Sequence, residues 1–484
     1  MNKIFILLII LFCCVSKGFS IDHPDTEIRA VWLTTNYGLD WPRNRTSQKE
    51  QEKELIAILD KLQRHNFNTV MFQARTRGEV FYVSDIEPMS SIVATDENKY
   101  QQFDPLAFAI EECHKRGIEI HAWIVTYPLG GDRHVRSLGS KSVTKRHPSL
   151  TKKFKNEWFI DPGNPRTDDY LMSIVNELVT NYDIDGIHFD YIRYPDNRGQ
   201  FPDDGMYRLH GKGKSRADWR RDNITRFVNR VYDEVKEKKP WVQVSSSPLG
   251  RYRTLNERGQ GWTAFETVFQ DAGKWMKTGK HDALYPMMYY KEELFYPYLD
   301  DWQLHSNGRI LVPGLGLYQM IELGWSSKDI TDQVNYSREK GVQGQAYFRT
   351  EDLFINRKGI LNELDAFYEY PAKLPSLKWL SDTIPDSPVD IRAEKLSNGL
   401  FELKWEIVDN DDRVTYNVYR SEDEDFCKDK PEKFLAVGLK RPTLIYEAED
   451  NDKAYYYYVT VSDSFHNESE PSKPAFFYHS ETVK

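Results

Sequence analysis

Hydrophobic and polar positions follow two different patterns along the chain. From residue 27 to about residue 370, short runs of β-branched or aromatic residues alternate with amphipathic stretches, as in parallel strands joined by crossover helices. The expected strands are 28–35, 68–75, 118–127, 185–192, 242–248, 282–290, 310–318 and 342–349. The expected helices include 48–66, 104–116, 166–182, 216–238 and 327–340. Eight such units over residues 27–370 predict a (β/α)8 barrel, the TIM barrel.

The pattern changes after residue 370. Residues 371–388 contain four prolines and no clear periodicity, which predicts a linker over 371–387. Beyond it, "LFELKWEI", "VTYNVYR" and "YYYYVTV" alternate with period 2 around Trp405, as strands with one buried face do. Residues 388–480 are therefore expected to form a small all-β sandwich, which resembles a fibronectin type III domain.

The first twenty residues have the composition of an export signal. Lys3 precedes an apolar run from residue 4 to 15, and small residues follow at Gly18 and Ser20. A lipoprotein signal is the less favoured alternative, because bulky Phe12 precedes the cysteine pair where small residues are needed. We expect an exported protein, periplasmic, cell-surface or secreted. No other stretch is long and apolar enough to predict a transmembrane segment.

Composition narrows the classes of partner. The 484 residues are 40% hydrophobic and 14% aromatic, with a net charge of −9. Removing a signal that contains Lys3 and Lys17 makes the charge −11, which argues against a nucleic acid partner. Cys113 and Cys427 would then be the remaining cysteines, one in each expected domain. They predict no disulfide framework.

The fourth expected strand, "DGIHFDYI", carries unusual chemistry for a buried strand. Successive side chains alternate faces, so Gly186, His188 and Asp190 share one face while Ile187 and Phe189 share the other. In a barrel the apolar pair would contact the helices and the polar face would point inward. Asp190 would then stand at the C-terminal mouth, where the active sites of such barrels lie.

Other strand ends contribute groups suited to a sugar. Flat aromatic faces pack against pyranose rings, and polar or charged groups bind hydroxyls. The predicted substrate-binding residues are Asn36, Arg75, His121, Trp123, His188, Arg193 and Tyr289. The expected partner is therefore a carbohydrate, bound without a cofactor.

Cleavage of a glycosidic bond normally needs two carboxyl groups. Asp190 is the predicted principal catalytic group. Asp271 is the predicted partner, because the long segment after the fifth strand can bring it over the mouth. The other acids near loops at this end of the barrel are Glu266, Glu292 and Glu351.

Several sequence blocks resemble one known family. "RAVWLTT", "FQARTRGEVFYVSDIEP", "HAW", "FIDPGNPRTDDYL", "YDIDGIHFDYIRYP" and "DALYPMMYY" are similar to the signature blocks of the glycosyl-hydrolase-like 10 family. The likeness implies a secreted bacterial glycosidase barrel acting on carbohydrate, with cell-wall glycan as one member of that class, and it matches Asp190 to the family's strand-four acid. The chain departs from the family pattern at Tyr191, where a second Asp is frequent, and at Met287, where Gln is frequent. A chitinase-type motif would place Glu where Ile192 stands.

Three other interpretations stay open on the sequence alone. Asp190 can be a structural acid that only binds Arg193. Two histidines, His121 and His188, can join Asp190 in a metal site, although their spacing matches no recognised ligand signature. The barrel can also be a surface protein that binds glycans without cleaving them. In each case the sandwich would space the barrel or associate with the cell surface or wall.

Overall fold

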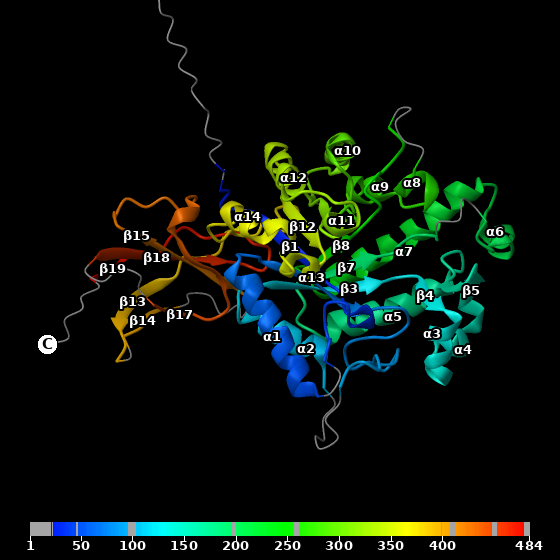
Figure 1. The fold of residues 1–484 in the computed structure, drawn as a ribbon, viewed down its shortest axis with the longest axis horizontal. Helices are drawn as coiled ribbons and strands as arrows, with labels where there is room; N and C mark the ends of the chain where they lie inside the picture. Colours follow the sequence, from blue (N-terminus) through cyan, green and yellow to red (C-terminus); the bar gives the residue numbers. More distant parts are fainter. Residues whose placement is uncertain are drawn as a thin grey trace, which may run out of the picture.

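The computed structural model describes residues 21–478, apart from residues 22, 45–46, 95–102, 196–199, 256–260, 398, 407–412 and 448–452. The predicted export signal, residues 1–20, lies outside the described residues. Figure 1 shows a barrel of strands and helices, coloured blue to yellow, beside a smaller all-β unit, coloured orange to red. This arrangement confirms the predicted fold class, a barrel followed by antiparallel sheets.

The barrel sheet is parallel and closed. Its strand order is β10-β9-β8-β7-β3-β2-β1-β12-β11. β10 and β11 are successive parts of one strand interrupted at residues 312–313, and they pair with β9 and β12 respectively. This shared strand closes the sheet and gives the predicted eight strand positions. The strands are β1 (Ile28–Leu33), β2 (Thr69–Arg75), β3 (Glu119–Val125), β7 (Gly186–Asp190), β8 (Gln243–Ser246), β9 (Ala283–Leu284), β10 (Ile310–Leu311), β11 (Gly314–Gly316) and β12 (Gly344–Phe348).

Amphipathic helices cover the outside of the barrel. In α1, Leu55, Leu59 and Leu62 are buried at helical spacing, and Ser47 caps the helix by accepting a hydrogen bond from the Glu50 N–H. None of the described helices is long and apolar enough to cross a bilayer. The larger outer helices are α1 (Gln48–Arg64), α2 (Pro105–His114), α5 (Arg166–Asn181), α7 (Arg216–Lys238), α10 (Glu292–His305), α12 (Ser327–Glu339) and α14 (Ile360–Phe367).

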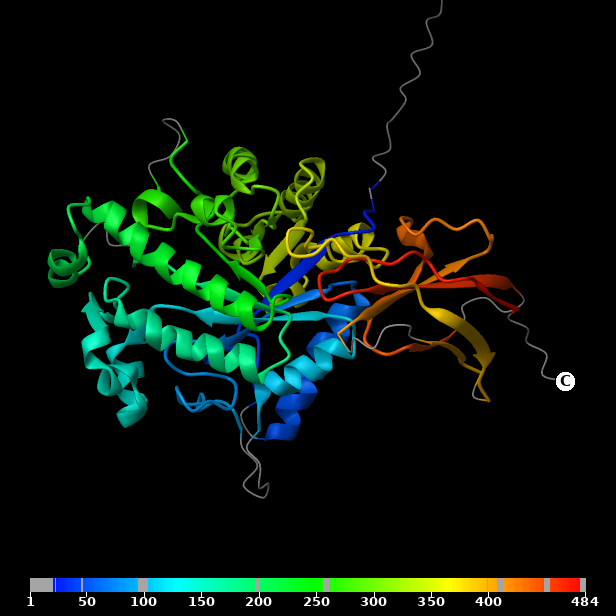
Figure 2. The same ribbon diagram turned by 180° about the vertical axis from the view of Figure 1, so that it is seen from behind.

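Between β3 and α5 the chain leaves the barrel pattern. Residues 128–160, called the β3–α5 excursion below, form a small antiparallel sheet of order β4-β6-β5 with short helices packed beside it. Figure 1 and Figure 2 both place this excursion at the end of the barrel away from the orange and red strands. Its elements are β4 (Pro128–Gly131), α3 (Asp132–Ser137), η2 (Gly139–Lys141), α4 (Val143–Arg146), η3 (Pro148–Leu150), β5 (Thr151–Phe154) and β6 (Glu157–Ile160).

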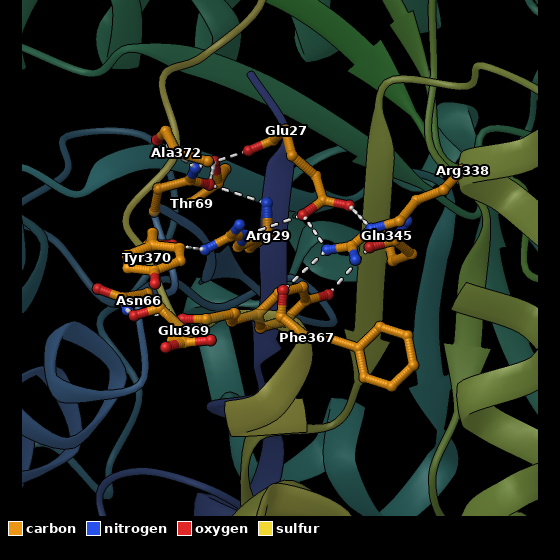
Figure 3. Close-up of polar contacts among 12 residues, drawn as sticks. Glu27, Arg29, Asn66, Thr69, Arg338, Gln345, Phe367, Glu369, Tyr370 and Ala372 are labelled. Carbon is orange, nitrogen blue, oxygen red and sulfur yellow. Dashed lines mark hydrogen bonds and ion pairs between the residues drawn. The ribbon is translucent and has the colours of Figure 1, made fainter. Parts of the chain in front are cut away.

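The end of the barrel where the strands begin, called the floor below, contains a buried ion-pair network. Glu27 accepts hydrogen bonds from Arg29 Nε at 2.9 Å and from Arg338 Nε and Nη2 at 2.8 Å each. Arg29 also donates to the Tyr370 carbonyl at 2.6 Å. Figure 3 shows both guanidinium groups converging on the Glu27 carboxylate. The network ties β1 to α12 and to the chain that leaves the barrel.

The predicted linker packs against the floor. Leu377 is fully buried and belongs to the apolar cluster inside the barrel, which also contains Trp32 and Tyr285. Trp379 donates its indole N–H to Asp282 at 2.9 Å. Apolar side chains of residues 374–380 thus fill the space beneath the strands, where a barrel would otherwise expose its interior.

Seven antiparallel strands form two sheets after the linker, of order β13-β14-β17 and β16-β15-β18-β19. Inward residues of both sheets pack around Trp405. This arrangement is consistent with the predicted fibronectin type III-like sandwich. The strands are β13 (Val389–Lys395), β14 (Phe401–Glu406), β15 (Thr415–Ser421), β16 (Phe434–Leu439), β17 (Thr443–Tyr446), β18 (Ala454–Ser462) and β19 (Ala475–Tyr478).

The sandwich contacts the floor through the loop after β18. His466 Nε2 lies 2.6 Å from Glu119 Oε1 at the start of β3. Lys373 Nζ donates to Glu468 at 2.8 Å. The sandwich therefore covers the floor, and the opposite end of the barrel stays open to a ligand.

Candidate active site

The C-terminal ends of the barrel strands surround a cavity of about 590 Å³, called the mouth below. Seven of the strand ends contribute to its wall, which combines carboxyl groups, aromatic rings and polar side chains. The lining residues are Thr34, Asn36, Leu39, Gln73, Thr76, Arg77, Trp123, Val125, Asp190, Tyr191, Met287, Tyr289, Tyr318, Ile321, Glu322, Phe348, Arg349 and Asp352. Such a cavity fits the general anatomy of a small-ligand site.

Asp190 ends β7 and lies in the mouth wall, 7% exposed. One carboxylate oxygen accepts a hydrogen bond from the Tyr191 N–H at 2.7 Å. Burial raises the pKa of Asp190 above its ordinary value, although the positive charge of Arg193 opposes this shift. Tyr191 adopts a left-handed φ of 51°, which is uncommon for a residue with a bulky side chain.

Three polar groups near Asp190 have hydrogen-bonding capacity to spare. Trp123 Nε1, Ser247 Oγ and Arg193 Nη1 are buried and have no hydrogen-bond partner among the described atoms. Each faces the Asp190 carboxyl group closely enough to lower its pKa against the effect of burial. Buried donors without partners are costly, and Trp123, the one of the three that lines the mouth, can donate its indole N–H to a ligand.

Aromatic rings form one side of the mouth. The Tyr289 and Phe348 rings stack with centroids 5.7 Å apart, and the Tyr318 ring meets Tyr289 edge-on at 5.6 Å. The structure therefore brings the predicted residue Tyr289 into the cavity beside Asp190, whose charge raises the pKa of Tyr289 together with burial, the larger cause. Flat rings of this kind present the apolar surface that a pyranose ring needs.

A second carboxyl group reaches the mouth from the last barrel strand. Asp352 lies in α13 (Thr350–Phe354), directly after β12, and is 7% exposed. Its Oδ2 atom is buried without a hydrogen bond to any described group, and Arg349 Nε lies 3.6 Å away. Burial raises the pKa of Asp352, and the Arg349 charge opposes the shift. Asp352 can therefore hold a proton at higher pH than an exposed aspartic acid.

Asp271, the predicted partner of Asp190, does not line the mouth. It precedes α9 (Ala272–Lys277) in the helical layer and accepts a hydrogen bond from the Tyr252 hydroxyl at 2.7 Å. The long segment after β8 packs Gln270 against the barrel instead, where its side chain bonds the Ile192 carbonyl at 3.3 Å. Asp271 therefore faces the outer helices.

The two predicted histidines lie deeper in the barrel than the mouth. His188 Nε2 accepts a hydrogen bond from the Trp32 indole at 3.2 Å, so its Nδ1 carries the proton toward Ser245 Oγ at 2.9 Å. Burial, then the neighbouring His121 and His281, lowers the pKa of His188 and keeps it neutral. His121 lies one layer nearer the floor, 3.4 Å from Glu119. Both are interior histidines, and neither lines the cavity.

Arg75 also differs from its predicted position. A register shift between Gln73 and Arg75 interrupts the pairing of β2 with β3, and such a bulge changes which face a side chain occupies. Arg75 is fully buried and makes two 2.7 Å bonds to the Glu87 carboxylate. The strand-two residue in the mouth is Gln73, whose amide oxygen accepts the Asn36 N–H at 2.8 Å and positions that predicted residue in the wall.

Among the described residues, no three His, Cys, Asp or Glu side chains are grouped to hold a metal ion. The sequence analysis did not single out Asp352, Tyr318, Phe348 or Arg349. A usable signal was present: in "FRTED", the two acids come directly after the end of the eighth strand, so they had to stand near the mouth. Glu351 was among the acids considered, and the structure puts its neighbour in the cavity.

A (β/α)8 barrel with carboxyl groups and aromatic rings at its mouth is the arrangement of a glycosidase. The family model for glycosyl hydrolase-like 10 matches residues 27–306, and the chain belongs to this family. It is 31% identical to glycosyl hydrolase YngK of Bacillus subtilis over 93% of each chain. These matches confirm the predicted family and the glycoside hydrolase class.

Two further likenesses cover less of the chain or are weaker. The chain is 33% identical to glycosyl hydrolase DigH of Escherichia coli over 54% of its own length and 65% of that protein. The solved glycoside hydrolase domain of PgaB (BpsB) from Bordetella bronchiseptica aligns with 71% of this chain and 99% of that one, at 15% identity and a TM-score of 0.47.

Proposed function

We propose that this chain is an exported enzyme that hydrolyses O-glycosidic bonds of a polysaccharide or oligosaccharide at the mouth of its barrel. The observation that carries the proposal is the pair of buried carboxyl groups, Asp190 and Asp352, in one aromatic-walled cavity. Glycoside hydrolysis requires such a pair. Bacterial cell-wall glycan is the substrate that the family likeness suggests.

The surroundings of the two carboxyl groups favour different roles. Asp190 faces the Tyr191 N–H, the Trp123 indole and the Arg193 guanidinium, which stabilise a carboxylate that acts as nucleophile or base. Asp352 has a bare buried oxygen and a raised pKa, which suit a proton donor to the leaving group. The aromatic wall of Tyr289 and its neighbours would bind the sugar ring.

The test is digestion of a glycan panel, including peptidoglycan glycan strands, with mass analysis of the products. Wild-type protein should release oligosaccharides with new reducing ends from at least one glycan. Asp190→Asn should reduce the rate by about 10³-fold and leave glycan binding nearly intact. Asp271→Asn is the matched control, because its carboxylate faces Tyr252 in the helical layer, and it should retain most activity.

A rival function is glycan binding without cleavage. It would be favoured if the wild-type protein bound one of these glycans in the mouth while no member of the panel gained reducing ends. An equal loss of activity in Asp190→Asn and Asp271→Asn would restore Asp271 as the catalytic partner. The export signal and an association of the sandwich with the cell surface stay predictions, which fractionation of the producing cell would check.

A further inference from the structure

The β3–α5 excursion has a charge opposite to that of the whole protein. Residues 128–160 contain eight Lys or Arg and two Asp or Glu, a net charge of +6, whereas the full chain carries −9. The overall negative charge argues against general attraction of polyanions. A local positive region on such a chain marks one place where an anion would be attracted.

Described groups hold two of the eight cations of the excursion: Lys153 pairs with Asp132 at 2.5 Å, and Arg146 donates to the Ile86 carbonyl. The other six, which form the basic patch, have no carboxylate partner among the described residues, and five of them are exposed while Lys152 is half-buried. The basic patch is defined as Arg133, Arg136, Lys141, Lys145, Lys152 and Lys155.

Helix α7 pairs its cations differently from the basic patch. Each of its five arginines has a carboxylate partner, as in the 2.7 Å pair of Arg220 with Asp203 and the 2.6 Å pair of Arg226 with Asp168. The remaining three are Arg216, Arg221 and Arg230. Like charges gathered without partners repel one another, so the basic patch has a cost that a bound anion would relieve.

The excursion adjoins the mouth directly. Arg77 lines the mouth, and its guanidinium donates to Glu157 of β6 at 2.8 Å. His134 of α3 lies 2.9 Å from the Arg77 carbonyl. The excursion begins where β3 ends at the mouth, and Figure 2 shows it on the side away from the sandwich. A chain-like ligand that leaves the mouth on this side would pass over the excursion, which carries the basic patch.

We infer that the basic patch binds an anionic polysaccharide, one that carries carboxylate or phosphate groups along its chain. This inference rests on the proposed function, because it names the chemical class of glycan that the mouth would cleave. The mouth would hold the bond to be cut, and the patch would attract and align the neighbouring charged sugars.

The experiment compares three ligands with one backbone: dextran, carboxymethyl dextran and phosphorylated dextran of equal length. Full-length protein carrying Asp190→Asn is used, so that turnover cannot remove ligand. Both charged polymers should bind more tightly than dextran. Raising the salt from about 0.02 M to 0.3 M should weaken binding of the charged polymers and leave binding of dextran unchanged. Preference for the carboxylated or the phosphorylated polymer would support the site and identify its anion.

Two triple variants test the patch itself. Arg133→Gln, Lys141→Gln and Lys145→Gln together should weaken binding of the charged polymers by about tenfold. The control removes the same charge at exposed sites outside the excursion, through Lys277→Gln, Lys430→Gln and Lys473→Gln. Equal affinities of the two variants would overturn the inference and leave the patch as solvated surface. Tighter binding of single-stranded DNA or of anionic phospholipid vesicles to the patch would also overturn it.

Failure of the proposed function is distinguishable from failure of the patch. If charged polymers bind through the patch while wild-type protein cleaves no glycan in the panel, the hydrolase proposal fails and the anion site stands. If wild-type protein cleaves a neutral glycan and the two triple variants cleave it equally well, the hydrolase proposal is supported. The inference that the substrate is an anionic polysaccharide is then wrong.

Discussion

The two ends of the barrel both bury carboxyl groups and treat them in opposite ways. At the floor, hydrogen bonds and charges from Arg338 and Arg29 outweigh burial and lower the pKa of Glu27. At the mouth, burial outweighs Arg193 and raises the pKa of Asp190. The charged form of the Glu27 carboxyl group is thus strongly favoured by its partners, whereas the charged form of the Asp190 carboxyl group is less strongly favoured.

The paired carboxyl group at the floor stabilises the fold, whereas the carboxyl groups at the mouth are free to serve the proposed reaction. A buried charge costs several kcal/mol unless partners replace the lost water, and the floor supplies such partners to Glu27 from two arginines. The mouth leaves two of its lining residues, Trp123 and Asp352, with buried polar atoms that have no hydrogen-bond partner among the described groups. A fold tolerates that loss of stability where a ligand completes the hydrogen bonds.

The largest expected effect on folding lies at the floor. Glu27→Gln should lower the free energy of unfolding by about 3–5 kcal/mol, because it removes the negative charge that the buried Arg29 and Arg338 share. Urea denaturation at neutral pH measures the loss. The matched change at the mouth, Asp190→Asn, should leave stability equal or slightly higher, since burial already disfavours the charged form there. Similar losses of unfolding free energy in both variants would contradict the difference between the two ends of the barrel.

The second effect concerns activity at the mouth. Asp352→Asn should reduce hydrolysis by about 10²–10³-fold without loss of stability, because it removes the proton donor. An acid with a raised pKa is protonated below that pKa, so the wild-type rate should fall as pH rises through it, and the variant should lack this fall. On an aryl glycoside with a good leaving group, Asp352→Asn should reduce the rate of hydrolysis much less.

The neighbouring acid provides the control for that experiment. Glu351 is ion-paired with Arg43 and Arg349, and it does not line the mouth. Glu351→Gln should keep most of the activity and the wild-type pH profile. If the two substitutions act alike, or if Asp352→Asn keeps its alkaline fall in rate, another group donates the proton.

The sequence was most informative where one periodicity decided the outcome. Short β-branched or aromatic runs between amphipathic stretches predicted the eight barrel strands, and the two-residue repeat of a strand predicted the inward face of Asp190. The two-residue repeat does not show how far along the barrel axis a side chain lies. His188 shares the face of Asp190, but it lies one layer nearer the floor, where Trp32 and Ser245 hydrogen-bond its ring. The histidine is therefore interior and the aspartate is in the mouth.

Other sites depended on irregular structure that no repeat encodes. The bulge in β2 turns Arg75 toward Glu87, and a one-residue irregularity leaves no clear trace in the hydrophobic pattern. The same holds for the segment after β8, which folds Asp271 into the helical layer. Asp352 reaches the mouth because α13 starts directly after β12. That short connection was readable in "FRTED", but its side-chain direction was not.

The smallest expected effect tests whether the contact between floor and sandwich is electrostatic. Although burial alone would lower it, the charge of Glu119 raises the pKa of His466 from 6.5 to about 9. A raised pKa adds stability that is complete below the unfolded value and disappears as pH rises through the folded value.

His466→Gln should therefore cost about 1–3 kcal/mol near pH 6.5, and the gap from wild type should close as pH rises through about 9. Unfolding free energies from urea titrations at several pH values measure this gap. His305, whose ion pair with Asp301 is 3.6 Å long and partly exposed, gives the control variant His305→Gln, with little gap at any pH. A gap that stays constant with pH would mean that His466 contributes by packing alone. Phe465 and the apolar linker would then hold the floor to the sandwich. This contact would not be electrostatic, unlike the Glu27 network inside the barrel.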